Sequence, residues 1–144
     1  MSISNKNIFI KNLMLKTDEF PVVEERFLLK ETLEKMNDFK LGVACVVDNN
    51  QNLKGVFTDG DFRRLLLKSQ RPLSRIFIED IIDIVGETFF SIDLESTLSE
   101  AIYFMEIKKI WDLPVINKKG KLKGLVHLHP AIKKLIKEIL FKLL

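Results

Sequence analysis

The chain has 144 residues, of which 47% are hydrophobic and 30% charged, and 23 basic and 20 acidic side chains leave a formal net charge of only +3. This excess is too small to be typical of a nucleic-acid-binding protein, and no run approaches the roughly 18 apolar residues that a membrane-spanning helix needs. The single cysteine, Cys45, excludes an internal disulfide and lies in an apolar run that favours a buried thiol over a nucleophile. The chain starts without the features of a secretion signal, so we expect one compact cytoplasmic domain.

Apolar periodicity divides the first half of the chain into short alternating elements. We expect a brief strand at 20–23, an amphipathic helix at 26–38, strands at 43–47 and 53–57, and a helix at 58–68. An Asp- and Asn-rich turn separates the two later strands, which therefore form a hairpin.

The second half of the chain repeats this order after a connecting segment. The apolar residues of 72–85 predict a linking helix. The elements expected after it are strands at 89–92, 113–116 and 122–126 and helices at 97–107 and 131–144.

The two halves align without a gap when the sequence is shifted by 69 positions. Identical residues then coincide: Phe20 with Phe89, Leu29 with Leu98, Glu31 with Glu100, Met36 with Met105, Val46 with Val115, and Leu53-Lys54-Gly55 with Leu122-Lys123-Gly124. A fixed period indicates one supersecondary unit used twice, each copy too small to bury its own apolar face. The expected division is a loose lead-in at 1–12, repeat one at 13–71, a linker at 72–85 and repeat two at 86–144.

The string Gly55-Val56-Phe57-Thr58-Asp59-Gly60-Asp61, closing the first strand-helix-strand-strand-helix unit, resembles CBS repeats, which pair into a Bateman module. This resemblance implies an α/β fold in which two β-α-β-β-α repeats pack through small three-stranded sheets about a pseudo-twofold axis. With Arg63-Arg64 after it, and with Gly124-Leu125-Val126-His127-Leu128-His129, the string is similar to the regulatory half of D-arabinose 5-phosphate isomerases, enzymes of lipopolysaccharide and capsule precursor synthesis. It also resembles CBS pairs attached to some sugar-phosphate nucleotidyltransferases.

The sugar-isomerase domain of that family has no counterpart here, because only about 12 residues precede the resemblance. We therefore expect no catalytic residues, and either a free-standing module or one excised from a longer protein. No general base for an isomerase reaction is evident.

The strand-to-helix corner at Thr58 is the main candidate ligand site. A helix N-terminus offers unpaired N–H groups to an anion, Gly60 permits close approach of the backbone, and the Thr58 hydroxyl can donate to a phosphate oxygen. Asp61 can accept from ribose hydroxyls. The competing structural interpretation is that Thr58 or Asp59 caps the helix and Asp61 complements its dipole.

The resemblance implies that Thr58 and Asp61 bind the phosphate and ribose of an adenosine nucleotide. It also implies that Pro21 and Val22 line the base pocket, although an apolar run is more often core. The second copy departs from the pattern, because His127 stands where Thr58 does and Pro130 where Asp61 does. We therefore expect at most one nucleotide per chain.

Four further features have an ordinary structural interpretation as well as a functional one. His127 and His129 could share one face of a strand as a metal pair, but no third ligand is evident, so no metal is expected. Arg63 and Arg64 suit either a phosphate or a solvated helix face, and Trp111 either a base or packing. The last helix is basic and amphipathic, which favours a partner helix over a membrane surface.

Three functions remain open. The first is a regulatory module that binds AMP, ADP, ATP or a CMP-sugar and modulates a sugar-phosphate enzyme. The second is a scaffold for dimerisation or docking whose pocket is vestigial, and the third is a fragment of a CBS-containing sugar-phosphate nucleotidyltransferase. No cofactor is required, and a homodimer is expected.

Overall fold

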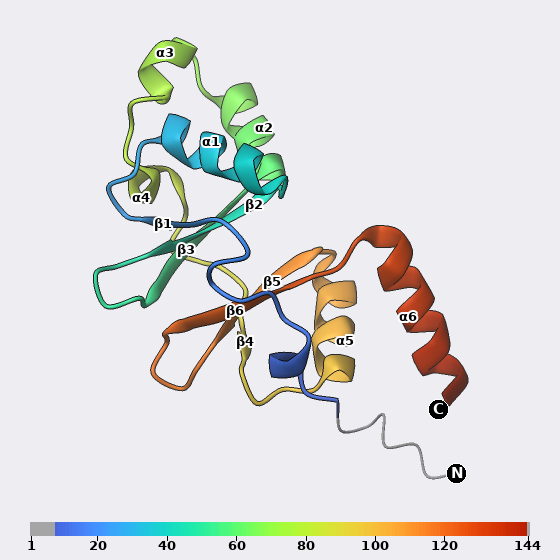
Figure 1. The fold of residues 1–144 in the computed structure, drawn as a ribbon. Coiled ribbons are helices and arrows are strands. Elements are labelled where there is room, and N and C mark those ends of the chain that lie inside the picture. The colour runs from blue at the N-terminus through green and yellow to red at the C-terminus, as the bar shows by residue number, and fades with distance from the viewer. Residues whose placement is uncertain (1–7, 144) are drawn as a thin grey trace.

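The computed structural model describes residues 8–143, without the side chains of residues 130, 131, 134, 135, 140 and 143. Two three-stranded sheets meet in the middle of the molecule, with α1 to α4 at one end and α5 and α6 at the other (Figure 1). A 3-10 turn at Ile10–Asn12 comes first. The elements of repeat one are β1 (Val22–Glu24), α1 (Leu29–Phe39), β2 (Val43–Val47), β3 (Leu53–Thr58) and α2 (Asp59–Lys68), followed by α3 (Leu73–Ile76) and α4 (Ile81–Ile84). Those of repeat two are β4 (Ile92–Asp93), α5 (Leu98–Lys108), β5 (Asp112–Ile116), β6 (Leu122–His127) and α6 (Pro130–Leu143).

The two sheets have the same topology and the same irregularities. In each, the short first strand runs parallel to the central strand, which pairs antiparallel with the third. The central strand of repeat one shifts register between Val46 and Val47, and that of repeat two between Val115 and Ile116. The first helix of each repeat ends on a left-handed lysine, Lys40 or Lys109. The α/β fold class and the period of 69 residues are therefore confirmed.

The linking segment is broken into two short helices, where the sequence pattern predicted one. The helix ends after Ile76 because the carbonyls that follow it accept hydrogen bonds from the start of α1. Phe77 O accepts a hydrogen bond from Lys30 N at 3.1 Å and Glu79 O one from Leu29 N at 2.9 Å. The linker thus provides partners for the first N–H groups of α1, which no carbonyl within that helix can satisfy.

The two hairpins join the repeats through a symmetric pair of backbone hydrogen bonds. Leu53 N donates to Gly120 O at 3.0 Å, and Leu122 N donates to Gln51 O at 2.9 Å. These residues are equivalent under the shift of 69 positions. A shared core of buried side chains from both sheets lies beside them: Phe20, Val43, Cys45, Val47, Leu53, Leu122 and Leu125.

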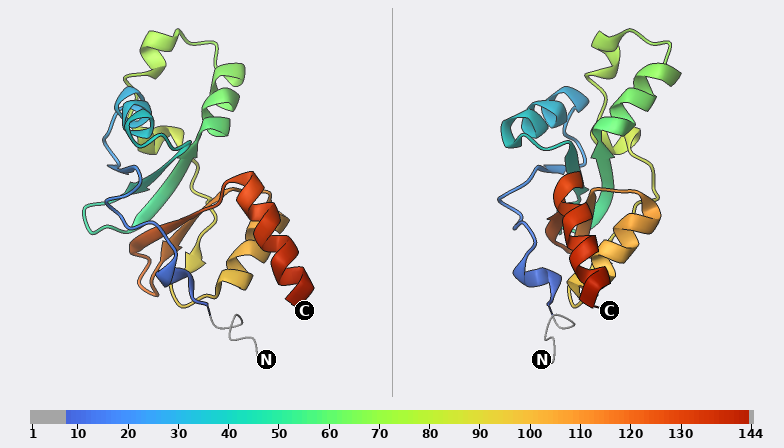
Figure 2. Two further views of the ribbon diagram at one scale, coloured as in Figure 1. Left: turned by 45° about the vertical axis from the view of Figure 1, so that its right-hand side comes forward. Right: turned by 90° about the vertical axis from the view of Figure 1, so that its right-hand side faces the viewer.

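The segment that precedes repeat one packs on repeat two. Ile10 is fully buried in the core of repeat two, and its N–H donates to Ser96 O at 3.0 Å. Leu15 and Leu125 exchange two backbone hydrogen bonds. Figures 1 and 2 show the N-terminal turn beside the elements of repeat two. From residue 8 onward, the expected loose lead-in is thus wrong, because Ile10 supplies part of a core that repeat two cannot complete alone.

The linker packs on repeat one in the equivalent way. Ile81 is fully buried there, and its N–H donates to Phe27 O at 2.7 Å. A Cβ on Gly55 would lie 2.5 Å from Val85, just as one on Gly124 would collide with Met14. Each repeat is therefore completed by the segment that precedes the other.

Ile10→Ala tests this exchange. We expect a loss of about 2–5 kcal/mol in unfolding free energy, because the substitution removes most of a fully buried side chain. Leu13→Ala is the matched control in the same segment, since Leu13 is 57% exposed, and it should cost less than about 0.5 kcal/mol. Denaturant unfolding measures both, and equal losses would contradict the exchange.

Candidate functional site

The corner between β3 and α2 is held by a reciprocal pair of hydrogen bonds. The Thr58 hydroxyl oxygen accepts from Asp61 N at 3.1 Å, and the Asp61 Oδ2 accepts from Thr58 N at 2.9 Å. This is a capping box, which satisfies two backbone donors at once. The capping interpretation of Thr58 and Asp61 therefore describes their contacts in this structure.

Both residues nevertheless retain capacity toward a ligand. The Thr58 hydroxyl acts here as an acceptor, so its own proton remains available for donation. Arg64 Nη2 donates to Asp61 Oδ1 at 2.8 Å, and the Asp61 side chain is 40% exposed. Arg64 also covers Gly60, where an added Cβ would lie 3.1 Å from the guanidinium. An incoming ribose would have to displace a surface ion pair of modest strength, worth about 0–1 kcal/mol.

Asp59 lies between this corner and repeat two. It is exposed, and its N–H donates to Gly42 O at 3.0 Å. A Cβ on Gly42 would come within 2.5 Å of the Asp59 carboxylate, so glycine at this position makes room for that side chain.

The equivalent corner of repeat two holds an imidazole and a carboxylate. His127 Nδ1 lies 2.6 Å from Asp112 Oδ1, and the Asp112 side chain is 15% exposed. Burial raises the pKa of Asp112, the hydrogen bond from His127 lowers it, and the negative charge of Asp59 raises it further. The charge of Asp59 therefore acts across the boundary between the repeats. Sequence reasoning singled out His127 but missed Asp112, whose signal was a carboxylate at the position equivalent to Val43.

Pro21 and Val22 lie at the same end of the sheet as Thr58. Val22 pairs with Cys45 on one side of β2, and Thr58 pairs with Val43 on the other. Two strand spacings of nearly 5 Å separate them. Pro21 O accepts from Cys45 N and Val22 O from Lys35 Nζ, so both carbonyls are already hydrogen-bonded. The topology therefore brings Pro21, Val22 and Thr58 to the same end of the sheet, without a direct contact between the first two and Thr58.

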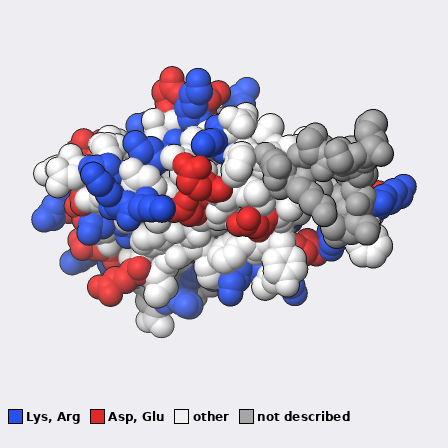
Figure 3. All heavy atoms as spheres, turned by 90° about the horizontal axis from the view of Figure 1, so that it is seen from below, with Lys and Arg blue, Asp and Glu red and all other residues white. Residues whose placement is uncertain are grey.

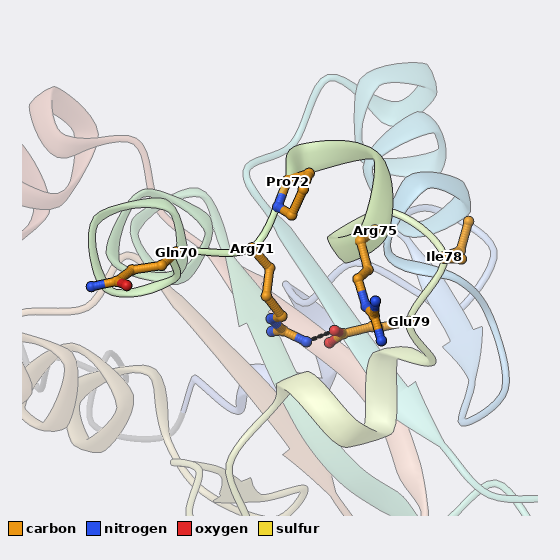
Figure 4. Close-up of a pocket in the computed structure, with 6 residues that line it drawn as sticks. All are labelled: Gln70, Arg71, Pro72, Arg75, Ile78 and Glu79. Carbon is orange, nitrogen blue, oxygen red and sulfur yellow. Dashed lines mark ion pairs between the residues drawn. The ribbon is translucent and has the colours of Figure 1, made fainter.

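Among the hollows formed by the described residues, two are lined by residues other than Pro21, Val22 and those of the Thr58 corner. One of about 650 Å³ lies at the turn between α2 and α3 (Figure 4), and its lining residues are Gln70, Arg71, Pro72, Arg75, Ile78 and Glu79. The other, of about 230 Å³, is lined by Glu24, Glu25, Arg26, Asn49, Ile82 and Asp83.

The remaining candidates have structural roles or solvent exposure. Cys45 is fully buried, and burial raises the pKa of its thiol well above the ordinary value, so it stays protonated. Trp111 is 56% exposed, which excludes a core role for it. Within the described range, no group of three or more His, Cys, Asp or Glu side chains is arranged to hold a metal ion.

The surface charges and the helix lengths are relevant to nucleic acid and to a membrane as binding partners. Lys, Arg, Asp and Glu are interspersed over the face in Figure 3. Across residues 8–143, no helix is both long and apolar enough to cross a bilayer.

Sequence comparison defines the class to which this architecture belongs. The CBS domain model matches residues 10–68 and 78–129, so the chain belongs to the CBS domain family, with two repeats in tandem. Solved structures agree in fold. The CBSX2 protein in complex with AMP superposes with a TM-score of 0.73 at 22% identity, covering 94% of this chain and 98% of that one. A CBS domain-containing protein of Bacillus anthracis gives 0.77 at 19%, covering 92% and 95%. CbpB in complex with c-di-AMP gives 0.72 at 16%, covering 97% and 91%.

The curated relatives are longer proteins than this chain. An uncharacterized protein of Rickettsia prowazekii, RP505, is 33% identical over 123 residues, which is 85% of this chain and 36% of that protein. Arabinose 5-phosphate isomerase KdsD of Francisella tularensis is 30% identical over 128 residues, or 86% of this chain and 36% of the isomerase. The chain thus spans little more than a third of these relatives, and the resemblance to isomerase-associated CBS pairs is confirmed.

Asp112→Asn tests the electrostatics between the corners. Because the pKa of Asp112 is higher in the folded than in the unfolded chain, the folded state binds more protons, and this group's contribution to stability falls as pH rises above about 4. The variant removes that penalty and keeps an oxygen that accepts from His127. We expect its melting temperature to rise relative to wild type as pH increases from 4 to 7.

Thermal unfolding across this pH range is the measurement. Asp18→Asn, which removes an exposed carboxylate, controls for the loss of one charge. A pH-independent difference between Asp112→Asn and wild type would contradict the burial penalty.

Proposed function

We propose that this CBS pair is a non-catalytic regulatory module that binds an adenosine nucleotide at the Thr58 corner. The observation that carries the proposal is the Thr58–Asp61 pair at the start of α2, beside a boundary between repeats. A hydroxyl donor, N-terminal backbone amides and a carboxylate stand together there, which suits phosphate and ribose. The fold is that of proteins solved with AMP and with c-di-AMP.

Binding would exchange the contacts of Asp61. In the structure Asp61 accepts from Arg64 and from Thr58 N. A ribose diol can replace Arg64 on Oδ1, and the released guanidinium can then pair with the phosphate in a bidentate fork. Pro21 and Val22, at the same end of the sheet, would supply apolar surface for the base, and Asp59 and Gly60 would line the phosphate side.

The corner of repeat two does not offer the same chemistry. Asp112 and His127 satisfy each other, and two carboxylates, Asp59 and Asp112, act on one another across the boundary. The residues equivalent to Thr58 and Asp61 are His127 and Pro130, so this corner lacks both the hydroxyl donor and the carboxylate acceptor for a ribose. We therefore expect one nucleotide per chain, with CMP-sugars as the alternative ligand class.

The regulated partner in this proposal is a sugar-phosphate enzyme of the arabinose 5-phosphate isomerase type, acting in the cytoplasm. The Francisella tularensis isomerase, which carries this name, matches 86% of the present chain. A ligand between two repeats can shift a partner only if it binds one arrangement of the repeats more tightly. The second candidate is a scaffold with a vestigial pocket, favoured by the capping box and ion pair that already satisfy Asp61.

Thr58→Ala distinguishes the two candidates. AMP at a hundred times its dissociation constant should stabilise the wild-type chain by about 2.7 kcal/mol. Thr58→Ala should lose this response and about 1 kcal/mol of intrinsic stability, because an N-cap is removed. Thr97→Ala is the matched control, since Thr97 caps α5 in the same way, accepting from Glu100 N at 3.2 Å.

Thermal unfolding with and without AMP, ADP, ATP or a CMP-sugar is the measurement. Thr97→Ala should lose similar stability and keep the nucleotide response. A wild-type chain that responds to none of these ligands at millimolar concentration would leave the scaffold function instead.

We also propose that the chain associates with a second copy of itself. Large apolar side chains remain exposed on the outer helices, among them Leu67 on α2 at 80% and Phe141 on α6 at 78%. Such surfaces suit a second copy of the chain. Light scattering at high micromolar concentration should give twice the 16.7 kDa chain mass. Leu67→Glu should lower the mass toward that of one chain, and a monomeric wild type would contradict the proposal.

A further inference from the structure

We propose that the hollow at the α2–α3 turn binds a phosphate monoester, and specifically that of a small sugar phosphate. The hollow has a volume of about 650 Å³ and is open to solvent. It lies beside α3, which Figure 1 places at the tip of the molecule farthest from repeat two. The residues that line it are all different from those of the Thr58 corner, so this proposal does not depend on nucleotide binding there.

The chain around the hollow is strongly basic. No acidic residue occurs between Phe62 and Ile78. The basic residues within that stretch are Arg63, Arg64, Lys68, Arg71 and Arg75. Their combined charge exceeds the net charge of the whole chain, and a local excess of one sign attracts the opposite ion.

Arg71 is held in position from two sides. Its backbone N–H and its Nε both donate to Ser69 Oγ, at 3.2 and 3.4 Å. Its terminal nitrogen forms an ion pair with Glu79. The hydrogen bond from Nε to Ser69 can remain when a phosphate replaces Glu79 on the terminal nitrogens, so part of the side chain is already ordered before binding.

Arg75 is the unpaired cation of the hollow. Among the side chains that the structure describes, none forms an ion pair or hydrogen bond with its guanidinium. Figure 4 shows Arg71, on the turn before α3, and Arg75, on α3, both extending toward Glu79. Two guanidiniums against one carboxylate leave a net positive charge. A phosphate can therefore bind both arginines, in competition with Glu79.

The walls around these arginines are anchored to the core of repeat one. Ile76, next to Arg75, is 1% exposed, and Arg75 N donates to Pro72 O at 3.0 Å. The Glu79 carbonyl is tied to α1 through Leu29 N. The backbone that carries the arginines is thus fixed before binding, which reduces the entropic cost of binding.

The remaining lining indicates more than a bare phosphate ion. Pro72 and Ile78 provide apolar surface beside the arginines, whereas the Gln70 side chain extends away from them (Figure 4). The apolar surface suits the carbon skeleton of a sugar attached to the phosphate. The predicted ligand class is therefore a hexose or pentose phosphate.

Isothermal titration with glucose 6-phosphate tests the proposal. The wild-type chain should bind it more tightly than inorganic phosphate and should not bind glucose. Arg75→Gln and the double variant Arg71→Gln/Arg75→Gln should weaken binding at least tenfold. Arg63→Gln, which removes one exposed positive charge of α2 outside the hollow, is the matched control and should change the affinity less than twofold.

Two further variants test the role of Glu79 and separate the hollow from the Thr58 corner. Glu79→Gln should tighten binding severalfold, because it removes the competing carboxylate, whereas weaker binding would overturn the proposed competition. Thr58→Ala should leave glucose 6-phosphate binding unchanged, and its loss would assign the ligand to the Thr58 corner. The Arg75 side chain makes no contact needed for folding. The proposal would be overturned if the wild type and Arg75→Gln bound glucose 6-phosphate equally well. It would also be overturned if the wild type bound inorganic phosphate as tightly as glucose 6-phosphate.

Discussion

The reciprocal packing of the two repeats is the constraint on which the rest of the structure depends. Each three-stranded sheet has one face covered by its own helices, and the opposite face is apolar and must meet another sheet. The exchange of backbone hydrogen bonds between the hairpins fixes the register of that meeting. Because the pair Leu53–Gly120 and the pair Leu122–Gln51 are related by the internal repeat, the contact is symmetric although the side chains around it have diverged.

That symmetry explains why the two candidate corners face a common boundary and why their chemistry differs. Backbone geometry is set by features that both repeats keep, such as the bulge in the central strand and the left-handed lysine that ends the first helix. Side chains at the corners are free of that constraint. Repeat one has a hydroxyl and a carboxylate that cap a helix, whereas repeat two has an imidazole paired with a buried carboxylate.

The sequence predicted the regular parts of this fold because they depend on local patterns. Strand β2 has the bounds expected from its apolar run, and α1, α5 and β6 differ by a few residues at their ends. The breaks in the linker and the burial of Ile10 could not be read locally, since both depend on partners distant in the chain. At the site, Thr58 and Asp61 were found from a motif. Arg64 on Asp61, Asp112 under His127 and the arginines of the α2–α3 hollow required coordinates, because charge pairing across elements leaves no periodic signal.

The crossing of the N-terminal segment has a mechanical consequence. Ile10 packs in the core of repeat two, and the chain then continues to β1 of repeat one. A force applied to this segment would therefore move the second sheet and change its angle to the first sheet, with the contact between the hairpins as the pivot.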